Sequence, residues 1–349
     1  MSTGAFHAPG RKSFGSDNHS PVHPVVMQAI MDANTGDAIG YGQDPWSAGA
    51  VEALKQLTGA RGEAYLVMNG TGANVLGLGI LLGRHEAVIC PASAHIYTDE
   101  GASPERILGA KLLPVPTADG KLTPDLIAPR LAARGVEHFA QPAVVSLTQA
   151  TEYGTCYTLA ELEAIYSYCS ANGVRVYMDG ARIANAAAHL GCTLADMAQY
   201  ADVLSFGGTK NGAMGVEAVV VMDSATTASA PYLRKQNGQL SSKMRYLGAQ
   251  LGALLSDDLW RQNAARANAM ATRLADGLAS IPGVSLLYPV EADILFARLS
   301  PGHIAALQKD WTFYVEDEAG RVARWVTAFD ASESDVDDFL AAIAATADA

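Results

Sequence analysis

The sequence predicts an α/β protein with a large, mainly parallel β-sheet unit followed by a smaller α+β unit. Short apolar runs alternate with helical patterns up to about residue 245, as in a chain of strand–helix units. Most of these runs are apolar on both faces, which is typical of strands covered by helices on each side. After Met244 the pattern changes to a long helical stretch followed by a compact series of strands and helices.

The first part of the chain provides the elements of the large unit. Helical patterns at 24–34 and 48–57 flank a loop that contains Gly, Pro and Trp. The expected strands are 64–68, 87–90, 111–115, 143–147, 174–178, 203–206 and 218–222. The helical patterns between and beside them are 72–83, 124–134, 159–172 and 192–201.

The C-terminal part predicts the smaller unit. A long helix is expected at 247–281, because Pro282-Gly283 is a strong stop signal. Strands at 284–288, 294–299, 312–316 and 321–328, and helices at 301–310 and from 332 onward, follow it. We therefore expect three parts: an N-terminal segment 1–20, a large domain 21–245 and a small domain 246–349.

Composition restricts the classes of function. The formal net charge of −12 argues against a nucleic-acid or anionic-membrane partner. The four cysteines show no metal-type spacing, so free thiols and no bound metal are expected. The first dozen residues lack the apolar core of a signal peptide, and no apolar run approaches the length of a membrane span. These features lead us to expect a soluble, cytoplasmic protein.

Two polar residues follow neighbouring strands in the positions where α/β proteins bind ligands. Asp179 ends the apolar run 174–178, and Lys210 stands in a glycine-rich turn after the run 203–206. Ligands of open α/β sheets bind beyond the carboxyl ends of the strands. Taken singly, Asp179 could cap a helix and Lys210 could be a solvated loop lysine. Together they match the needs of pyridoxal phosphate (PLP), which takes a lysine for a Schiff base and an acid for its pyridine nitrogen.

A third feature is the glycine-rich turn at Asn69-Gly70-Thr71-Gly72, which opens a helical pattern. Backbone N–H groups at the start of a helix form an anion site that suits a phosphate. Many loops contain such a turn, and its position ahead of Asp179 and Lys210 is what favours the phosphate site.

These motifs carry a resemblance to a known family. The segments Asp179-Gly-Ala-Arg182, Gly207-Gly-Thr-Lys210-Asn-Gly and 69–74 resemble those of fold type I PLP enzymes and, within them, of low-specificity L-threonine aldolases. The likeness covers most of the chain, from the SDN motif at 16–18 to Arg324, and is greatest for the bacterial branch with SDN, TDE, QATE and GGTKNG motifs.

The resemblance implies a role for each matching residue. Lys210 would bind PLP, Asp179 would pair with the pyridinium nitrogen and His95 would stack on the ring of the cofactor. These three residues would also be the catalytic residues. Phosphate contacts would come from Gly70, Thr71, Gly72 and Thr209, and from Arg245 of a neighbouring subunit. Arg182 would lie near the phenolic edge of the cofactor and the substrate. The substrate contacts would be Asn18, Arg324, Glu152 and Tyr41, the last from the partner chain of a homotetramer or homodimer.

The chain departs from the family at one position. Many threonine aldolases carry a Thr-His-Asn-Gly motif where this chain reads Thr151-Glu152-Tyr153-Gly154. The general base is therefore open between His95, Glu152 and a bound water. His19 and His23 could also lie near the entrance of the site.

The implied activity is reversible retro-aldol cleavage of L-threonine, L-allo-threonine and related L-β-hydroxy-α-amino acids to glycine and an aldehyde. Three alternatives stay open. Another fold type I enzyme, such as an aminotransferase or a β-eliminating lyase, would use the same lysine and aspartate. A dehydrogenase would need a GxGxxG turn after its first strand, and none is so placed. The third alternative is a non-catalytic PLP-binding or scaffold protein.

Overall fold

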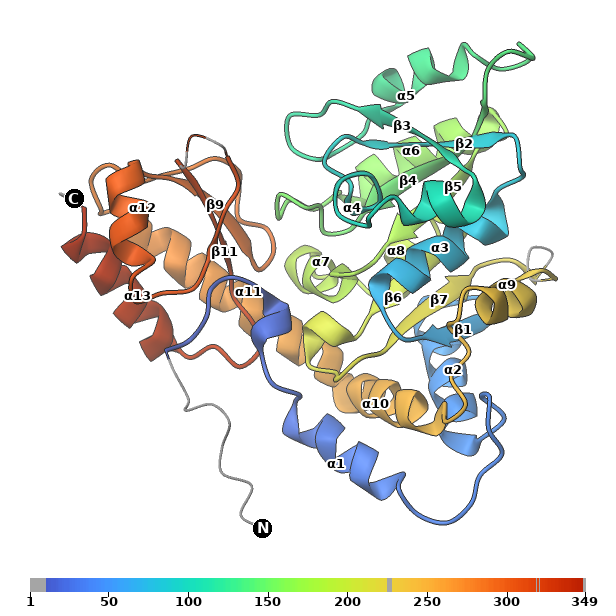
Figure 1. The fold of residues 1–349 in the computed structure, drawn as a ribbon, viewed down its shortest axis with the longest axis horizontal. Coiled ribbons are helices and arrows are strands. Elements are labelled where there is room, and N and C mark those ends of the chain that lie inside the picture. Colours follow the sequence, from blue (N-terminus) through green and yellow to red (C-terminus); the bar gives the residue numbers. More distant parts are fainter. Residues whose placement is uncertain (1–10, 225–227, 318, 320, 348–349) are drawn as a thin grey trace.

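The fold is known from a computed structural model that describes residues 11–224, 228–317, 319 and 321–347. The first ten residues of the expected N-terminal segment 1–20 lie outside this range. The chain forms a larger unit around a seven-stranded sheet and a smaller unit around a four-stranded sheet. Helix α11 (Leu259–Leu278) runs from the larger unit to the smaller one (Figure 1).

The larger sheet has the strand order β1-β7-β6-β5-β4-β2-β3. Strands β2 to β6 pair in parallel with one another, whereas β7 is antiparallel to both of its neighbours, β1 and β6. The strands are β1 Ala64–Val67, β2 Glu86–Pro91, β3 Lys111–Val115, β4 Gln141–Thr148, β5 Arg175–Asp179, β6 Val203–Gly207 and β7 Glu217–Val221. The expected α/β fold with a mainly parallel sheet is confirmed.

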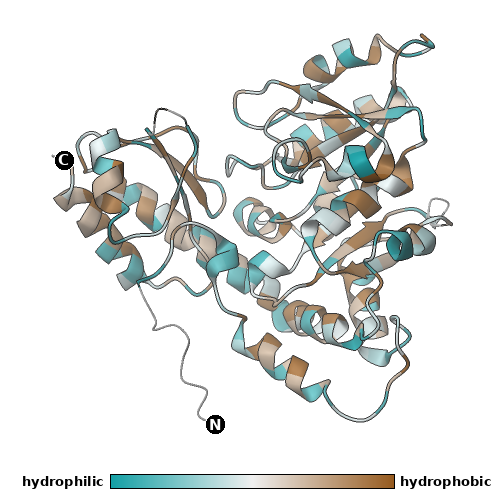
Figure 2. Ribbon diagram, in the orientation of Figure 1, coloured by the Kyte–Doolittle hydropathy of each residue, from teal (hydrophilic) through white to brown (hydrophobic). Residues whose placement is uncertain are grey.

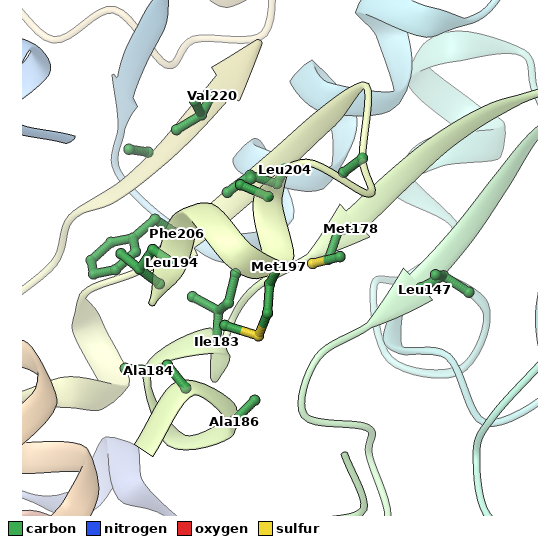
Figure 3. Close-up of a cluster of buried hydrophobic side chains, with 14 of the residues drawn as sticks. Leu147, Met178, Ile183, Ala184, Ala186, Leu194, Met197, Leu204, Phe206 and Val220 are labelled. Atoms are coloured by element: carbon green, nitrogen blue, oxygen red, sulfur yellow. The ribbon is translucent and has the colours of Figure 1, made fainter. Parts of the chain in front are cut away.

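Successive residues of a strand face opposite sides of the sheet, and both sides here are apolar. In β4 and β5, Val145 and Met178 belong to a core formed with helices α2, α6, α7, α8 and α10. Val144 and Tyr177 belong instead to a core formed with helix α3. Figure 3 shows part of the first core, in which Met178 of β5 and Phe206 of β6 lie near the apolar side chains of α7 and α8. This covering of both faces explains why both faces of the strands carry mostly apolar side chains.

Helices surround the larger sheet, and apolar residues concentrate in the strands and in the helix faces turned toward them (Figure 2). They are α1 Pro24–Asp32, α2 Pro45–Thr58, α3 Gly70–Leu81, α4 His95–Thr98, α5 Pro124–Leu131, α6 Leu159–Ala171, α7 Ile183–Leu190, α8 Leu194–Ala198, α9 Ala230–Gln236 and α10 Arg245–Leu255. Side-chain caps fix several starts, such as Thr158 in a capping box with Glu161 at α6. The helical ranges expected from the sequence did not include α4, α7 or α9.

The smaller unit packs two helices on an antiparallel sheet of order β10-β11-β9-β8. Its elements are β8 Ser285–Leu286, β9 Ile294–Arg298, α12 Pro301–Leu307, β10 Tyr314–Val315, β11 Val322–Val326 and α13 Glu333–Ala345. Its core contains Trp325 and Phe339, both fully buried. Phe14 of the N-terminal segment stacks on Phe339 with ring centroids 4.4 Å apart, so this segment completes the core of the smaller unit.

The prediction of one helix over 247–281 is wrong. The helix α10 ends at Leu255, and α11 begins at Leu259 after a short 3-10 segment. Asp257 and Asp258 have φ values of 52° and 55°, in the left-handed region that interrupts a right-handed helix and that aspartate tolerates better than most residues. The break lets α10 pack on α1 and α2 while α11 contacts α7 and α13. The domain boundary near residue 245 stays a prediction.

No helix within the described ranges combines the length and the apolar character needed to cross a membrane.

Candidate active site

The candidate site lies at the carboxyl ends of the parallel strands. Asp179 ends β5 and is the register partner of Thr148 at the end of β4. Lys210 follows β6 in a 3-10 turn, Thr209–Asn211, and α3 begins just after β1. Because the carboxyl ends of parallel strands meet at one edge of a sheet, these segments come together as the sequence predicted.

Asp179 is buried and faces α3. The alternation along β5 puts it on the same side as Tyr177, in the layer that packs against α3. Its Oδ1 accepts hydrogen bonds from the backbone N–H of Ala181 (2.9 Å) and from Ser205 Oγ (3.4 Å), and its Oδ2 accepts one from Asn74 Nδ2 (3.0 Å). These three donors from different elements fix the orientation of the carboxylate.

The turns after β5 and β6 are held against each other by close backbone approach. Gly207 N–H donates to the carbonyl of Gly180 (3.0 Å). A Cβ on Gly207 would lie 2.3 Å from the carbonyl oxygen of Ala181, and one on Gly180 would lie 2.0 Å from that of Ser205. Only glycine fits at both places. The two turns that carry Asp179 and Lys210 are therefore kept side by side.

Lys210 is half-buried, and carboxyl groups lie within range of its charge. Burial raises the pKa of Glu217 to about 7, while a hydrogen bond from Thr209 and the charge of Lys210 oppose this rise. The backbone N–H of Gly208 donates to Glu217 Oε2 (2.9 Å). Glu217 thus stabilises the lysine turn from inside the fold, a contact that no sequence motif indicated.

His95 begins α4 and is held at two points. Its Nδ1 lies 2.8 Å from Glu100 Oε1, and its backbone N–H donates to Glu152 Oε1 (2.9 Å). The hydrogen bond to Glu100 is the main cause of a raised His95 pKa, which burial and the charge of Lys210 lower in part. His95 is therefore oriented by Glu100 in addition to any contact with a ligand.

Glu152, which stands where the family motif has histidine, lies between β4 and α4. Its Oε1 accepts hydrogen bonds from Thr148 Oγ1 (2.8 Å) and from the His95 backbone (2.9 Å). Its Oε2 is buried and has no hydrogen-bond partner in the part of the chain that the structure describes. Burial raises the pKa of Glu152, although the hydrogen bonds to its carboxylate oppose the rise. The Oε2 atom of Glu152, a carboxyl group with a raised pKa, is thus free to contact a ligand.

Arg182 forms a buried ion-pair cluster with two carboxylates. Its Nε donates to Asp17 Oδ2 (2.8 Å) and its Nη2 to Asp17 Oδ1 (3.0 Å), and Asp293 Oδ1 lies 3.5 Å from Nε. Burial raises the pKa of Asp293 to about 7. For Asp17, the attraction of Arg182 and Lys210 outweighs burial and lowers the pKa. Arg182 therefore joins the N-terminal segment, the larger unit and Asp293, the residue just before strand β9 of the smaller unit.

Arg324 lies on the face of the smaller sheet that carries Phe296 and Tyr314, its register partners in β9 and β10. Its contacts are long: Nη1 is 3.4 Å from the Gly15 carbonyl and Nε is 4.0 Å from Glu316 Oε1. Burial lowers the Arg324 pKa. A partly buried guanidinium without a close carboxylate is suited to bind one from a ligand.

The N-terminal turn of α3 is built as the sequence predicted. Asn69 caps the helix, accepting a hydrogen bond from the backbone N–H of Gly72 (2.8 Å). A Cβ on Gly72 would lie 2.2 Å from the side chain of Gln239, which also accepts a hydrogen bond from the Met68 backbone (2.9 Å). The first N–H groups of a helix have no partner within it, so Gly70 and Thr71 present donors at this turn.

The remaining expected residues lie apart from this cluster or at its edge. Arg245 Nη1 donates to the carbonyls of Thr35 (3.1 Å) and Gly36 (3.0 Å) in its own chain. Tyr41 is 51% exposed and has the ammonium of Lys235 over its ring. Asn18, next to Asp17, is exposed. Entry of Arg245 and Tyr41 into a partner's site stays a prediction.

The two histidines named as neighbours of the entrance differ in position. His23 packs on Phe329, and its backbone N–H donates to the carbonyl of Gly212 beside the lysine turn (2.8 Å). His19 contacts Ser13 (2.7 Å) and Tyr314 (3.3 Å).

Sequence reasoning assigned no role to several residues that complete the site. They are Asp17, Asn74, Glu100, Ser205, Glu217, Gln239 and Asp293. Three of these stand inside motifs that the sequence singled out: the SDN motif, the TDE motif and the segment 69–74. Within the described ranges there is no group of three or more His, Cys, Asp or Glu side chains that could hold a metal ion.

Comparison with known proteins identifies the family of this chain. The family model for beta-eliminating lyases matches residues 13–300. The low-specificity L-threonine aldolase of Pseudomonas aeruginosa is 44% identical over 87% of this chain and 89% of its own. That of a second Pseudomonas strain is 41% identical over 96% and 97%.

Solved structures show the same relationship. The threonine aldolase of Leishmania major superposes with a TM-score of 0.91 at 32% identity, covering 96% of this chain and 98% of that one. The serine palmitoyltransferase of Sphingomonas wittichii, at 15% identity and a TM-score of 0.74, shares the fold. The chain therefore belongs to the beta-eliminating lyase family of fold type I and, within it, to the low-specificity L-threonine aldolases.

Proposed function

We propose that this chain cleaves L-threonine, L-allo-threonine and related L-β-hydroxy-α-amino acids to glycine and an aldehyde, with PLP as its cofactor. The observation that carries the proposal is the meeting of Asp179, the Lys210 turn and the α3 N-terminus at one edge of the sheet. The relatives that are 41% and 44% identical over most of the chain bear the name of this activity.

The donor set fits PLP. Lys210 offers an amine, the buried Asp179 offers a carboxylate, and the start of α3 offers N–H groups to a phosphate. Gly72 is buried, and its lack of a side chain lets Gln239 lie against the first turn of α3, with Gln239 Cδ 2.2 Å from where a Cβ would lie. When bound, PLP would supply an electron sink for the carbon–carbon bond cleavage. Thr209 and Arg182 are the further cofactor contacts that we propose.

The substrate is held by cations and amides of this chain. We assign its carboxylate to Arg324 on β11 and to Asn18 in the N-terminal segment, which the contact of Arg324 Nη1 with the Gly15 carbonyl brings near each other. A planar guanidinium can grip a carboxylate with two hydrogen bonds and so fixes the direction of the scissile bond. We assign uptake of the β-hydroxyl proton to Glu152, whose Oε2 is buried and has no hydrogen-bond partner among the described residues. His95 and a bound water are the other candidates for this proton transfer.

We propose further that the enzyme is a cytoplasmic homo-oligomer, a dimer or tetramer. An apolar groove of about 660 Å³ lies between α1 and α10. Its lining includes Met31 and Met214, which are 62% and 53% exposed, and it reaches Met68 and Gly215, next to the two ligand-binding turns. A second copy seated there would border the site, as expected if Arg245 and Tyr41 act across an interface. Met214→Glu should lower the sedimentation-derived mass, whereas Tyr232→Glu on α9 should leave it unchanged.

The test of the activity is an aldehyde-release assay on the four stereoisomers of threonine. The L isomers should give glycine and acetaldehyde in equal amounts without a keto acid. Lys210→Ala should lose both the absorbance of bound PLP and the activity, while Lys309→Ala, an exposed matched control, should keep both. Keto acid in place of aldehyde would identify an aminotransferase, and ammonia release would identify a β-eliminating lyase. PLP binding without any turnover would leave the scaffold alternative.

A further inference from the structure

A continuous hydrogen-bonded chain links His95 to Asp179 through two residues for which the sequence suggested no role. His95 Nδ1 lies 2.8 Å from Glu100 Oε1. The same oxygen accepts a hydrogen bond from Asn74 Nδ2 (2.7 Å), and Asn74 Nδ2 also donates to Asp179 Oδ2 (3.0 Å). Asn74 is fixed at its other end, because its Oδ1 accepts a hydrogen bond from Tyr177 OH (2.7 Å).

The members of this bridge come from three parts of the larger unit: α3, α4 with the turn after it, and β5. Asn74 is on the first turns of α3, Glu100 follows α4, and Asp179 and Tyr177 are on β5. The side chain of Glu100 is 1% exposed and Asn74 is 2% exposed, so water competes little for these hydrogen bonds. Both hydrogens of the Asn74 amide are used on carboxylates, which allows two acidic side chains to lie near each other in the interior.

We propose that Glu100 is a positioning residue. Its contact with His95 fixes the orientation of the ring and the nitrogen that carries the proton, and its contact with Asn74 couples His95 to the Asp179 carboxylate. The inference rests on the proposed function in one respect, the identity of the ligand that binds between His95 and Asp179. Glu100 itself touches neither reacting atoms nor cofactor. Its carboxylate requires a hydrogen on His95 Nδ1, so Nε2 is the ring atom whose proton can change.

Other charged groups also face His95, and they set the background for the test. Asp99 Oδ2 is 3.8 Å from Nε2 but 82% exposed. Glu152 accepts from the His95 backbone, and Lys210 and Asp179 act on the ring with opposite signs. A buried carboxylate at 2.8 Å should dominate over a solvated one at 3.8 Å, because solvent screens the exposed pair. Asp99→Asn is therefore a matched control for Glu100→Gln.

The experiment follows the His95 ring by NMR during a pH titration of histidine-labelled protein, with and without PLP and in the absence of substrate. His95→Gln assigns the signal. Glu100→Gln keeps the shape and removes the charge, so the His95 midpoint should fall by about 1 pH unit, against less than about 0.3 for Asp99→Asn. The absorbance of bound PLP should change its pH dependence in Glu100→Gln and in Asn74→Ala, because both break the link to Asp179.

An unchanged His95 midpoint in Glu100→Gln would overturn the proposal, as would equal shifts in Glu100→Gln and Asp99→Asn. If Glu100→Gln does not fold, Glu100→Asp keeps the charge at a greater distance. Its His95 midpoint should then lie between the wild-type value and a value about 1 pH unit lower, the shift expected for loss of the charge. A wild-type midpoint in that variant would also count against the proposal. Because no substrate is present, these results do not depend on aldehyde release. A protein with the His95 shift but no cleavage of β-hydroxy amino acids would reject the proposed function alone.

Discussion

Arg182 binds Asp17 with two parallel hydrogen bonds of 2.8 and 3.0 Å, although the two residues are 165 positions apart. Both side chains are almost fully buried. The pair ties the N-terminal segment, whose Phe14 completes the core of the smaller unit, to the turn after β5. A bidentate pair of this kind resists separation of the two units at the site.

Asp17→Asn should weaken this tie strongly. The variant keeps the shape of the side chain but leaves the buried guanidinium with Asp293 alone, at 3.5 Å. Removing one partner of a buried ion pair costs about 3 kcal/mol, so the free energy of unfolding in urea should fall by that amount. Asp37→Asn, at an exposed position, is the control and should stay within about 0.5 kcal/mol. Equal stability of both variants would contradict the role of the pair.

Asp293 should make stability depend on pH. Burial raises its pKa to about 7, so the folded protein holds this proton more tightly than the unfolded chain does. The contribution of such an acid to the free energy of unfolding is present at low pH and is lost as the pH rises from about 4 to about 7. The side chain of Asp293→Asn stays neutral at every pH. Between about pH 5.5 and about pH 8.5, the Tm of this variant should therefore fall by about 2 °C less than the Tm of the wild type. Asp310→Asn, exposed in the same unit, should follow the wild type.

Arg324→Lys tests the carboxylate site. Lysine keeps the charge but not the planar fork, so one of two hydrogen bonds to the substrate is lost. We expect KM for threonine to rise about 10- to 100-fold with a smaller change in kcat, since the interaction is made in ground and transition states alike. Arg321→Lys, an exposed change three positions away, should leave both constants unaltered. A large fall in kcat at unchanged KM would assign Arg324 to another task.

Glu152→Gln tests the proton acceptor. Because burial raises the pKa of Glu152, its ionised fraction should increase as the pH rises, and the rate of cleavage should increase with it. The glutamine variant removes this group and should lower kcat about 100-fold and abolish the acid limb of the pH–rate profile. Glu163→Gln on the exposed side of α6 serves as the control. If the acid limb persists in Glu152→Gln, His95 or a water takes the proton.

The strands and most helices could be predicted because their signals are local. Runs such as 143–147 and 174–178 are largely apolar, with Ser146 and Arg175 as the polar members, because β4 and β5 are covered by helices on both faces. The same reasoning placed Asp179 and Lys210 together, because the carboxyl ends of parallel strands meet at one edge. It failed at residues 257–258, where two aspartates in the left-handed region divide one helical pattern into α10 and α11. Apolar periodicity continues through such a break, so the pattern alone does not show it.

The sequence by itself determined the α/β fold class, the lysine and aspartate of the site, and, through motif resemblance, the family. Only the tertiary structure decided which carboxylates surround them. Glu100 meets Asn74 across 26 positions and Asn74 meets Asp179 across 105, which depends on how α3 and the turn after α4 settle on the sheet. Short-range patterns record which face of an element is buried, but not which side chain of another element it will meet. Hydrogen bonds between distant elements depend on that packing, and so does the environment that tunes Asp179 and His95.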